Sequence, residues 1–169
     1  MRRDRIALFG AVLLLLLPLL CGPTQAADPA AKPTLSLTGK VPHPQQFDLD
    51  RLRALPSQQV QVSYETEHNG SRQASYTGVL LWSLIGEAGG IDDQARGAVL
   101  RHVIKITAQD GYVVVLSTGE IAPDFGAKPA LIAYQRDTEA PGAGGLWLVM
   151  PGDKLGGRYV HDVVAIDVE

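Results

Sequence analysis

The strongest constraint on the fold of this chain is a run of alternating apolar and polar residues that turns back on itself within residues 59–78. Period-two alternation is typical of a strand with one buried face. The apolar members of the first half are Val60, Val62 and Tyr64. Asn69-Gly70 then favours the positive φ angles of a type I′ turn. The segment is therefore predicted to be a β-hairpin.

Shorter runs of the same kind follow along the chain. A second hairpin is predicted from residues 100–108 and 112–117, which flank Asp110-Gly111. Further strands are predicted at residues 35–41, 130–136, 145–151 and 158–168. These strands neighbour each other through hairpins, without regular alternation of strands and helices. The predicted fold class is therefore α+β, mostly β, with mixed sheets and short helices.

Three short helices complete the prediction. The first spans residues 47–55, with Asp48 as its N-cap. The second spans residues 79–90 and closes at Gly89-Gly90. The third is a brief turn in which Ser117 and Glu120 form a capping box.

The first 26 residues have the layout of a secretory signal peptide. Arginines precede the apolar run at residues 6–20, which is shorter than the roughly 20 residues of a membrane span. Thr24 and Ala26 suit a cleavage site. We therefore expect a signal peptide at 1–26, a flexible lead-in at 27–34 and one domain at 35–169, in the periplasm or secreted, with no membrane span after cleavage. A retained anchor and lipidation at Cys21 are the alternatives.

Charge and cysteine content narrow the function classes. The chain has 15 basic and 18 acidic residues, and removal of three arginines and one aspartate with the signal peptide leaves a net charge of −5. Nucleic acid is therefore not an expected partner, because its binding requires a basic surface. The single cysteine, Cys21, would also be removed. The domain would then have no disulfide, thiolate nucleophile or thiolate metal ligand.

The best candidate for a binding site is the glycine-rich segment 151–161. Consecutive backbone amides can form an anion-binding nest, and an arginine can bind a phosphate with two hydrogen bonds. The candidate residues are Lys154, Gly156, Gly157, Arg158, Tyr159 and His161. A simple turn between strands explains the same glycines. The four histidines show no metal-binding spacing, and no G-x-S-x-G motif indicates a serine hydrolase.

Three blocks of the chain, taken together, resemble the sulfite oxidase type of molybdopterin-binding domain. They are YTGVLLWSLI at 76–85, DGYVVVLSTGEIAPDFGAKPALIAY at 110–134 and GLWLVMPGDKLGGRYVHDVVAIDV at 145–168. The resemblance implies an α+β fold, a molybdenum-pterin cofactor and oxidation or reduction of small oxo-compounds such as sulfite. It also implies that Gly157 and Arg158 lie near the pterin phosphate, with His161 where the family has a lysine or arginine.

The chain departs from the family where the chemistry takes place. Family enzymes bind molybdenum through a cysteine just upstream of the first block, and the window 60–70 contains none. A hydroxyl is a poor substitute for a soft thiolate. Trp147 replaces an arginine of the third block, and the N-terminal part of larger family enzymes is missing. The sequence after Arg2-Arg3 is a poor twin-arginine signal, which favours secretion of an unfolded chain.

These observations favour a secreted binding or accessory domain for a small anionic or pterin-like ligand, without a molybdenum centre bound through cysteine. Whether the protein is an enzyme stays open. One alternative is an active molybdopterin oxidoreductase of the sulfite or sulfoxide type. Another is a periplasmic sensor or interaction module with an unknown protein partner.

Overall fold

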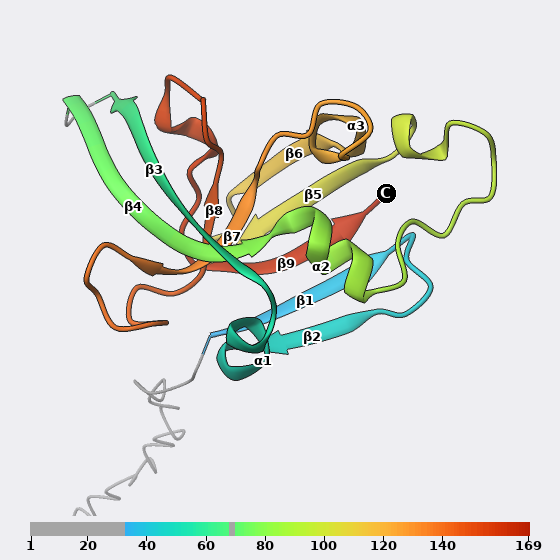
Figure 1. Ribbon diagram of the computed structural model, residues 1–169, viewed down its shortest axis with the longest axis horizontal. Coiled ribbons are helices and arrows are strands. Elements are labelled where there is room, and N and C mark those ends of the chain that lie inside the picture. Colours follow the sequence, from blue (N-terminus) through green and yellow to red (C-terminus); the bar gives the residue numbers. More distant parts are fainter. Residues whose placement is uncertain (1–32, 68–69) are drawn as a thin grey trace, which may run out of the picture. The chain divides into compact units, whose positions relative to one another are not determined.

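Nine strands form two sheets in the computed structural model, which describes residues 33–67 and 70–169 (Figure 1). Sheet A has the order β2-β1-β9-β5-β6 and sheet B the order β3-β4-β7-β8. Sheet A contains β1 (Thr34–Gly39), β2 (Gln45–Asp48), β5 (Val103–Ala108), β6 (Val113–Ser117) and β9 (Val163–Val168). Sheet B contains β3 (Ser57–Thr66), β4 (Gly70–Leu80), β7 (Leu131–Arg136) and β8 (Trp147–Val149).

Short helices connect the strands. They are α1 (Leu49–Ala54), α2 (Leu81–Glu87) and α3 (Thr118–Ile121), with 3-10 turns η1 (Ala98–Leu100) and η2 (Gly156–Arg158). The predicted class, α+β and mostly β with short helices, is confirmed. The predicted signal peptide 1–26 and residues 27–32 of the lead-in lie outside the described residues. None of the described helices is long and apolar enough to cross a membrane.

The first and last strands of the domain are neighbours in sheet A. β1 pairs with β9 in parallel, with Ser36 opposite Ala165, and β9 pairs on its other side with β5 in antiparallel fashion. β2, which the sequence analysis did not predict, pairs with β1. Only Phe47 of its four residues is buried, so the segment carries no apolar alternation.

The structure confirms one predicted helix cap and corrects another. The Asp48 side chain accepts a hydrogen bond from the Arg51 backbone N–H at 2.8 Å and caps α1. The capping box at α3 is wrong, because the Ser117 side chain makes no cap hydrogen bond. The Glu120 carboxylate binds the Arg158 guanidinium instead, with Nη1 3.0 Å from Oε1.

Both predicted hairpins form. In the β3–β4 hairpin Thr66 pairs with Gly70, which has a φ of +63°. A two-residue turn at Asn69-Gly70 is therefore wrong, because Gly70 already belongs to β4. In the β5–β6 hairpin the Ala108 N–H donates to the Tyr112 carbonyl, and Gly111 has a φ of +88°. A glycine with positive φ at the end of a three-residue loop gives this connection.

Sheet B is buried on both faces at β7. Neighbouring residues of β7 point to opposite sides, and all of Leu131, Ile132, Ala133 and Tyr134 are buried. Ile132 and Tyr134 pack in the main core with the inner face of sheet A. Leu131 and Ala133 belong to a second cluster. This cluster contains Val62, Tyr76, Val149 and Tyr159 as well, so the segment after β8 covers the second face.

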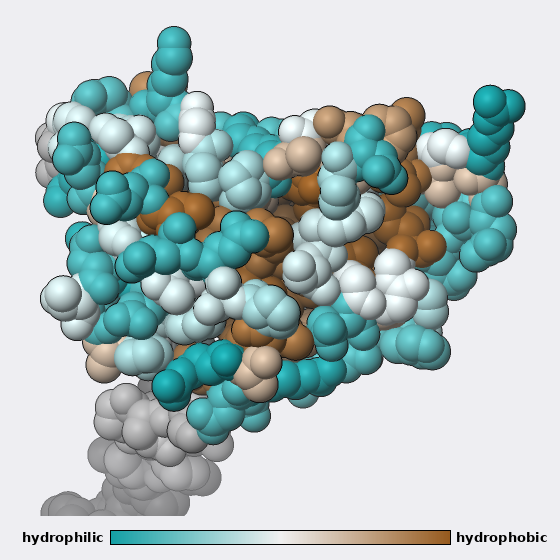
Figure 2. Space-filling model, viewed as in Figure 1, coloured by the Kyte–Doolittle hydropathy of each residue, from teal (hydrophilic) through white to brown (hydrophobic). Residues whose placement is uncertain are grey.

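Strand β4 bends at the point where its backbone comes close to that of β7. The register between β4 and β7 shifts between Thr77 and Gly78. A Cβ atom at Gly78 would lie 2.3 Å from the Ile132 oxygen and 2.4 Å from the Ala133 Cα. Such a bulge bends a strand, and Figure 1 shows β4 strongly curved. Hydrophilic residues cover most of the face seen in Figure 2, with hydrophobic residues between them in the middle and near α3.

We predict that Gly78→Ala lowers the free energy of unfolding by roughly 3 kcal/mol, because the added methyl group overlaps backbone that cannot rotate away. Gly86→Ala is the matched control. Gly86 lies in α2 with no atom within 4 Å of its ideal Cβ position. Alanine there should raise the free energy of unfolding by up to about 1 kcal/mol. Urea denaturation measures both, and a shift of equal sign and size would contradict the prediction.

Candidate functional site

The six predicted site residues line three concave regions, one of which is a cavity of about 250 Å³ beside Asp110 and Tyr112 that is lined by Gly156, Gly157, Tyr159 and His161. Gly156, Tyr159 and His161 also line a cavity of about 350 Å³, which we call the aromatic cavity. The residues that complete its lining are Tyr64, Thr66, Arg72, Gln73, Ala74, Arg136 and Trp147. Lys154, Gly157 and Arg158 line a shallow hollow of about 430 Å³. The structure therefore places the predicted arginine and lysine apart from the predicted aromatic residues.

Arg158 is held by two carboxylates. Its Nε and Nη2 atoms donate to the two oxygens of Asp153, each at 2.7 Å. Its Nη1 donates to Glu120 Oε1 at 3.0 Å. The Lys128 ammonium contacts Asp153 and lies 3.5 Å from Glu120 Oε1. Two positive and two negative side chains thus form a neutral network that joins the 151–158 segment to α3.

The network changes the proton affinity of its members. Burial alone would raise the pKa of Asp153, but the hydrogen bonds from Arg158 and Lys128 outweigh it and hold that pKa below its usual value. The hydrogen bond to Asp153 raises the pKa of Arg158 in turn. An external anion would have to displace Asp153 from this guanidinium, so Arg158 acts here as a structural cation.

Two stacked ring pairs form the walls of the aromatic cavity. Tyr64 from β3 stacks on Tyr159, with ring centroids 3.9 Å apart and planes at 16°. Trp147 at the start of β8 stacks on His161, with centroids 4.3 Å apart and planes at 16°. The Trp147 Nε1–H donates to the Gly144 carbonyl at 3.0 Å, which fixes the indole. The β3–β4 hairpin and the segment after β8 therefore meet through their aromatic side chains.

The lining of the aromatic cavity contains two arginines and one histidine as its basic side chains. They are Arg72, Arg136 and His161, and no carboxylate belongs to the lining. Within the described residues, no ion pair involves Arg72. The Arg136 Nε lies 3.4 Å from Asp137 Oδ2, yet that buried nitrogen has no hydrogen bond of acceptable geometry. The cavity thus offers positive charge that the protein does not fully neutralise.

One buried tyrosine, Tyr159, forms part of these walls, and a second, Tyr76, packs against Trp147. The Tyr159 hydroxyl donates to the Met150 carbonyl at 2.9 Å, and burial raises its pKa to about 12. Tyr76 is fully buried, with its ring 5.6 Å from that of Trp147. Burial raises the Tyr76 pKa, and its hydroxyl has no partner of acceptable geometry although Tyr64 is near. Both phenols stay neutral at physiological pH and cannot supply an anionic ligand.

The sequence analysis did not identify Tyr64, Arg72 or Arg136 as site residues. Tyr64 and Arg72 are cross-strand partners in the β3–β4 register. A two-residue turn at Asn69-Gly70 would pair Tyr64 with Ser75 and would separate it from Arg72. The hairpin register is therefore the signal that could have located these residues.

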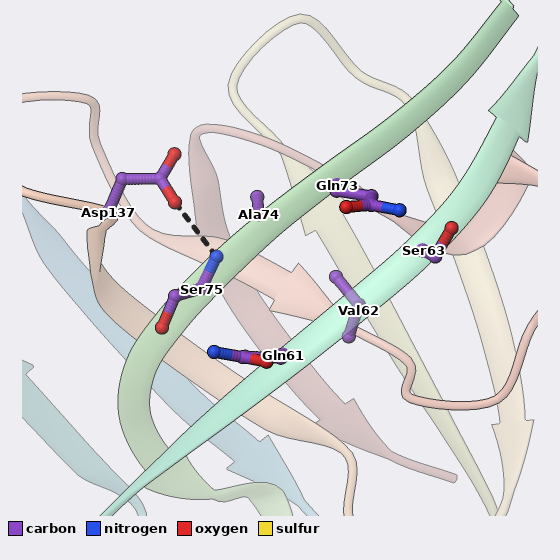
Figure 3. A pocket seen from close by; sticks show the side chains of 7 residues that line it. All are labelled: Gln61, Val62, Ser63, Gln73, Ala74, Ser75 and Asp137. Atoms are coloured by element: carbon purple, nitrogen blue, oxygen red, sulfur yellow. Dashed lines mark hydrogen bonds between the residues drawn. The ribbon is translucent and has the colours of Figure 1, made fainter.

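A further hollow of about 470 Å³ lies over the β3–β4 hairpin (Figure 3). Its side chains are mainly amides and hydroxyls, contributed by Gln61, Ser63, Gln73 and Ser75. Its single carboxylate, Asp137, accepts a hydrogen bond from the Ser75 backbone N–H at 2.8 Å. This hollow contains no cation and is a poorer candidate for binding an anion.

The aromatic cavity suits one part of a molybdenum-pterin group and not the other. Its arginines and aromatic rings suit a planar organic anion. Its hydroxyl donors, Tyr64 and Thr66, are hard neutral oxygens, and residues 27–169 contain no thiolate. No group of three or more His, Cys, Asp or Glu in the described ranges is arranged to hold a metal ion. The residues present therefore do not fit a molybdenum ion bound through the protein.

Comparison with known proteins supports the fold. No protein-family model matches the chain, and no curated protein sequence matches it either. Among solved structures, the chain is similar to the sulfane dehydrogenase SoxCD from Paracoccus pantotrophus, with a TM-score of 0.64 and 20% sequence identity. The match covers 80% of this chain and 38% of that chain. At this identity the likeness shows a common fold and leaves the activity to be proposed.

We predict that Asp153→Asn lowers the free energy of unfolding at neutral pH by roughly 1–3 kcal/mol, because it leaves Arg158 and Lys128 with one carboxylate. The native state lowers the Asp153 pKa, so this contribution is present above the unfolded value of about 3.9 and disappears as pH falls through the native value. The difference between wild type and variant should therefore shrink below about pH 4.

The matched control is Asp124→Asn, which removes the same charge from an exposed loop residue. Denaturant titrations between about pH 3 and pH 7 measure both variants against wild type. An equal effect of the two substitutions, or a difference that does not depend on pH, would show that the network does not stabilise the 151–158 segment.

Proposed function

We propose that this chain is an exported binding protein, without catalytic activity of its own, for a small planar anion of the pterin-like kind. The aromatic cavity is its binding site. The observation that carries the proposal is the lining itself, in which Arg72, Arg136 and His161 stand among aromatic rings with no carboxylate.

The charge distribution supports an anionic ligand. The whole chain has a net charge of −3, whereas the lining of the aromatic cavity holds basic side chains and no carboxylate. A cationic cavity in an acidic protein concentrates positive electrostatic potential at one place and favours the binding of an anion there. Arg136 has a buried Nε without a hydrogen bond, and an anion would supply the missing acceptor.

The ring pairs support a flat ligand. Aromatic faces bind other flat π-systems with an energy beyond that of simple burial. Trp147 is fixed by its hydrogen bond to the Gly144 carbonyl, and Tyr159 by its hydrogen bond to the Met150 carbonyl. Since these rings are already ordered, binding would lose little side-chain entropy.

The fold and the sequence resemblance support the pterin-like class. The chain is similar in fold to a sulfane dehydrogenase, and its three sequence blocks resemble the sulfite oxidase-type molybdopterin-binding domain. The donor atoms of the cavity favour the organic part of that cofactor over its metal. We therefore assign no redox step to the chain and propose a binding or accessory role.

The place of action is also part of the proposal. Residues 1–26 have the layout of a signal peptide, which would deliver the domain to the periplasm or the exterior. The poor twin-arginine pattern favours export before folding, so the ligand would be acquired after export.

We predict that the protein binds pterin-6-carboxylate, an anionic pterin, and quenches the fluorescence of Trp147. Arg72→Gln and Arg136→Gln should each weaken this binding roughly tenfold, because each removes a charge-assisted hydrogen bond. Lys154→Gln is the matched control, since it removes one positive charge from an exposed residue outside the cavity. Equal losses in all three variants would point to nonspecific charge attraction.

Metal analysis of protein purified after export provides a second measurement. The proposal predicts no stoichiometric molybdenum, because the cavity lacks a thiolate. One molybdenum per chain, with turnover of sulfite or a sulfoxide, would instead support an active oxidoreductase.

A further inference from the structure

The two sheets have four edge strands, and the chain closes three of these edges in part or whole. At β2 the Arg51 Nη1 donates to the Gln46 carbonyl at 2.9 Å. At β8 the Leu148 backbone exchanges two hydrogen bonds with Val160. At β3 the Glu65 N–H donates to the Lys154 carbonyl at 2.8 Å. Closing edges in this way prevents unwanted strand pairing.

The edge at β6 has no such cover among the described residues. The Val103 backbone exchanges hydrogen bonds with Glu169, on the β9 side. The following residue, Ile104, therefore faces β6, where it pairs with Leu116. Backbone groups alternate along a strand, so Val114 and Leu116 bond to β5. The backbone N–H and C=O groups of Val113 and Val115 point to the open edge.

Apolar side chains lie beside this open backbone. Val113 and Val115 alternate with the buried Val114 and Leu116, so they project from the outer face of sheet A. Val103 of β5, opposite Ser117, is exposed as well, and Val164 is exposed two strands from the edge, on β9. These four valines are between 36% and 54% exposed, and they are half of the large exposed hydrophobic residues recorded among the described residues. β6 itself carries no charged residue and no proline.

We propose that β6 pairs with β6 of a second copy of this chain. Two copies related by a two-fold axis can add edge to edge only in antiparallel orientation. The two five-stranded sheets A would then form one continuous sheet, with the valines of both copies side by side on its outer face. This interface is separate from the aromatic cavity, whose lining includes no residue of β6.

Charge argues for a second copy as the occupant. Two acidic chains repel each other, and the uncharged segment Val113–Ser117 keeps that repulsion low at the contact. A two-fold axis within this segment places valine against valine or serine, with no like charges opposed. Lys105, the β5 residue opposite Val115, is already paired with Glu169 at 2.8 Å.

The size of the patch sets the strength of the dimer. Four partly exposed valines amount to an apolar patch of at most a few hundred Å². A stable interface buries about 800 Å² on each partner. Strand pairing adds backbone contacts but does not reach a permanent dimer, so the dimer should dissociate on dilution.

Sedimentation equilibrium of the full chain tests the proposal. The wild type should change from monomer to dimer mass as the concentration rises to about 1 mM. Val115→Lys should remain monomeric over the same range, because two lysines would face each other across the axis. Gln61→Lys is the matched control, since it places the same charge on an exposed residue of the edge strand β3 and should dimerise like wild type. A monomeric wild type, or equal dimerisation of both variants, would overturn the proposal.

Amide hydrogen exchange gives a readout that does not depend on any variant. The amides of Val114 and Leu116 bond to β5 and should be protected at every concentration. Those of Val113 and Val115 should become protected only as the protein concentration rises. Exchange of Val113 and Val115 that does not change with concentration would overturn the pairing, even if the chains associate through another surface.

Discussion

The backbone contact between Gly78 and β7 is the constraint on which the rest of the domain depends. The Ile132 oxygen and the Ala133 Cα leave no room for a side chain at that position. The bulge beside it bends β4. The curved hairpin carries Tyr64 of β3, whose ring stacks on that of Tyr159. The second core cluster and the aromatic cavity both lie under this curve. A position without a side chain thus determines where the aromatic side chains meet.

The glycine-rich segment after β8 contributes residues both to the Arg158 ion-pair network and to the lining of the aromatic cavity. The sequence pattern singled out this segment, and its residues Gly156, Tyr159 and His161 line the aromatic cavity. It could not show that Arg158 is bound by Asp153 and Glu120, because Glu120 lies 38 residues away in the chain. The two arginines of the cavity, Arg72 and Arg136, come from other strands, β4 and β7.

The sequence predicted the elements whose cause is local. Asp48 caps α1 because its acceptor lies three residues from the N–H it binds. Both hairpins follow from alternation and a glycine. β2 was not predicted, since its place depends on pairing with β1 and one buried residue, Phe47. The predicted capping box at Ser117 is wrong for a similar reason, because Glu120 binds Arg158, which is 38 residues away in the chain. Local rules failed where a long-range partner competed for the same group.

The parallel pairing of β1 with β9 has a consequence for the order of events during synthesis. Residues 34–39 hydrogen-bond to residues 163–168, and β9 also separates β1 from β5. Sheet A therefore cannot assemble until the last strand has left the ribosome. Contacts between such distant segments also form slowly. Sheet A is thus complete only after β9 has been made, an order compatible with the proposed export of an unfolded chain.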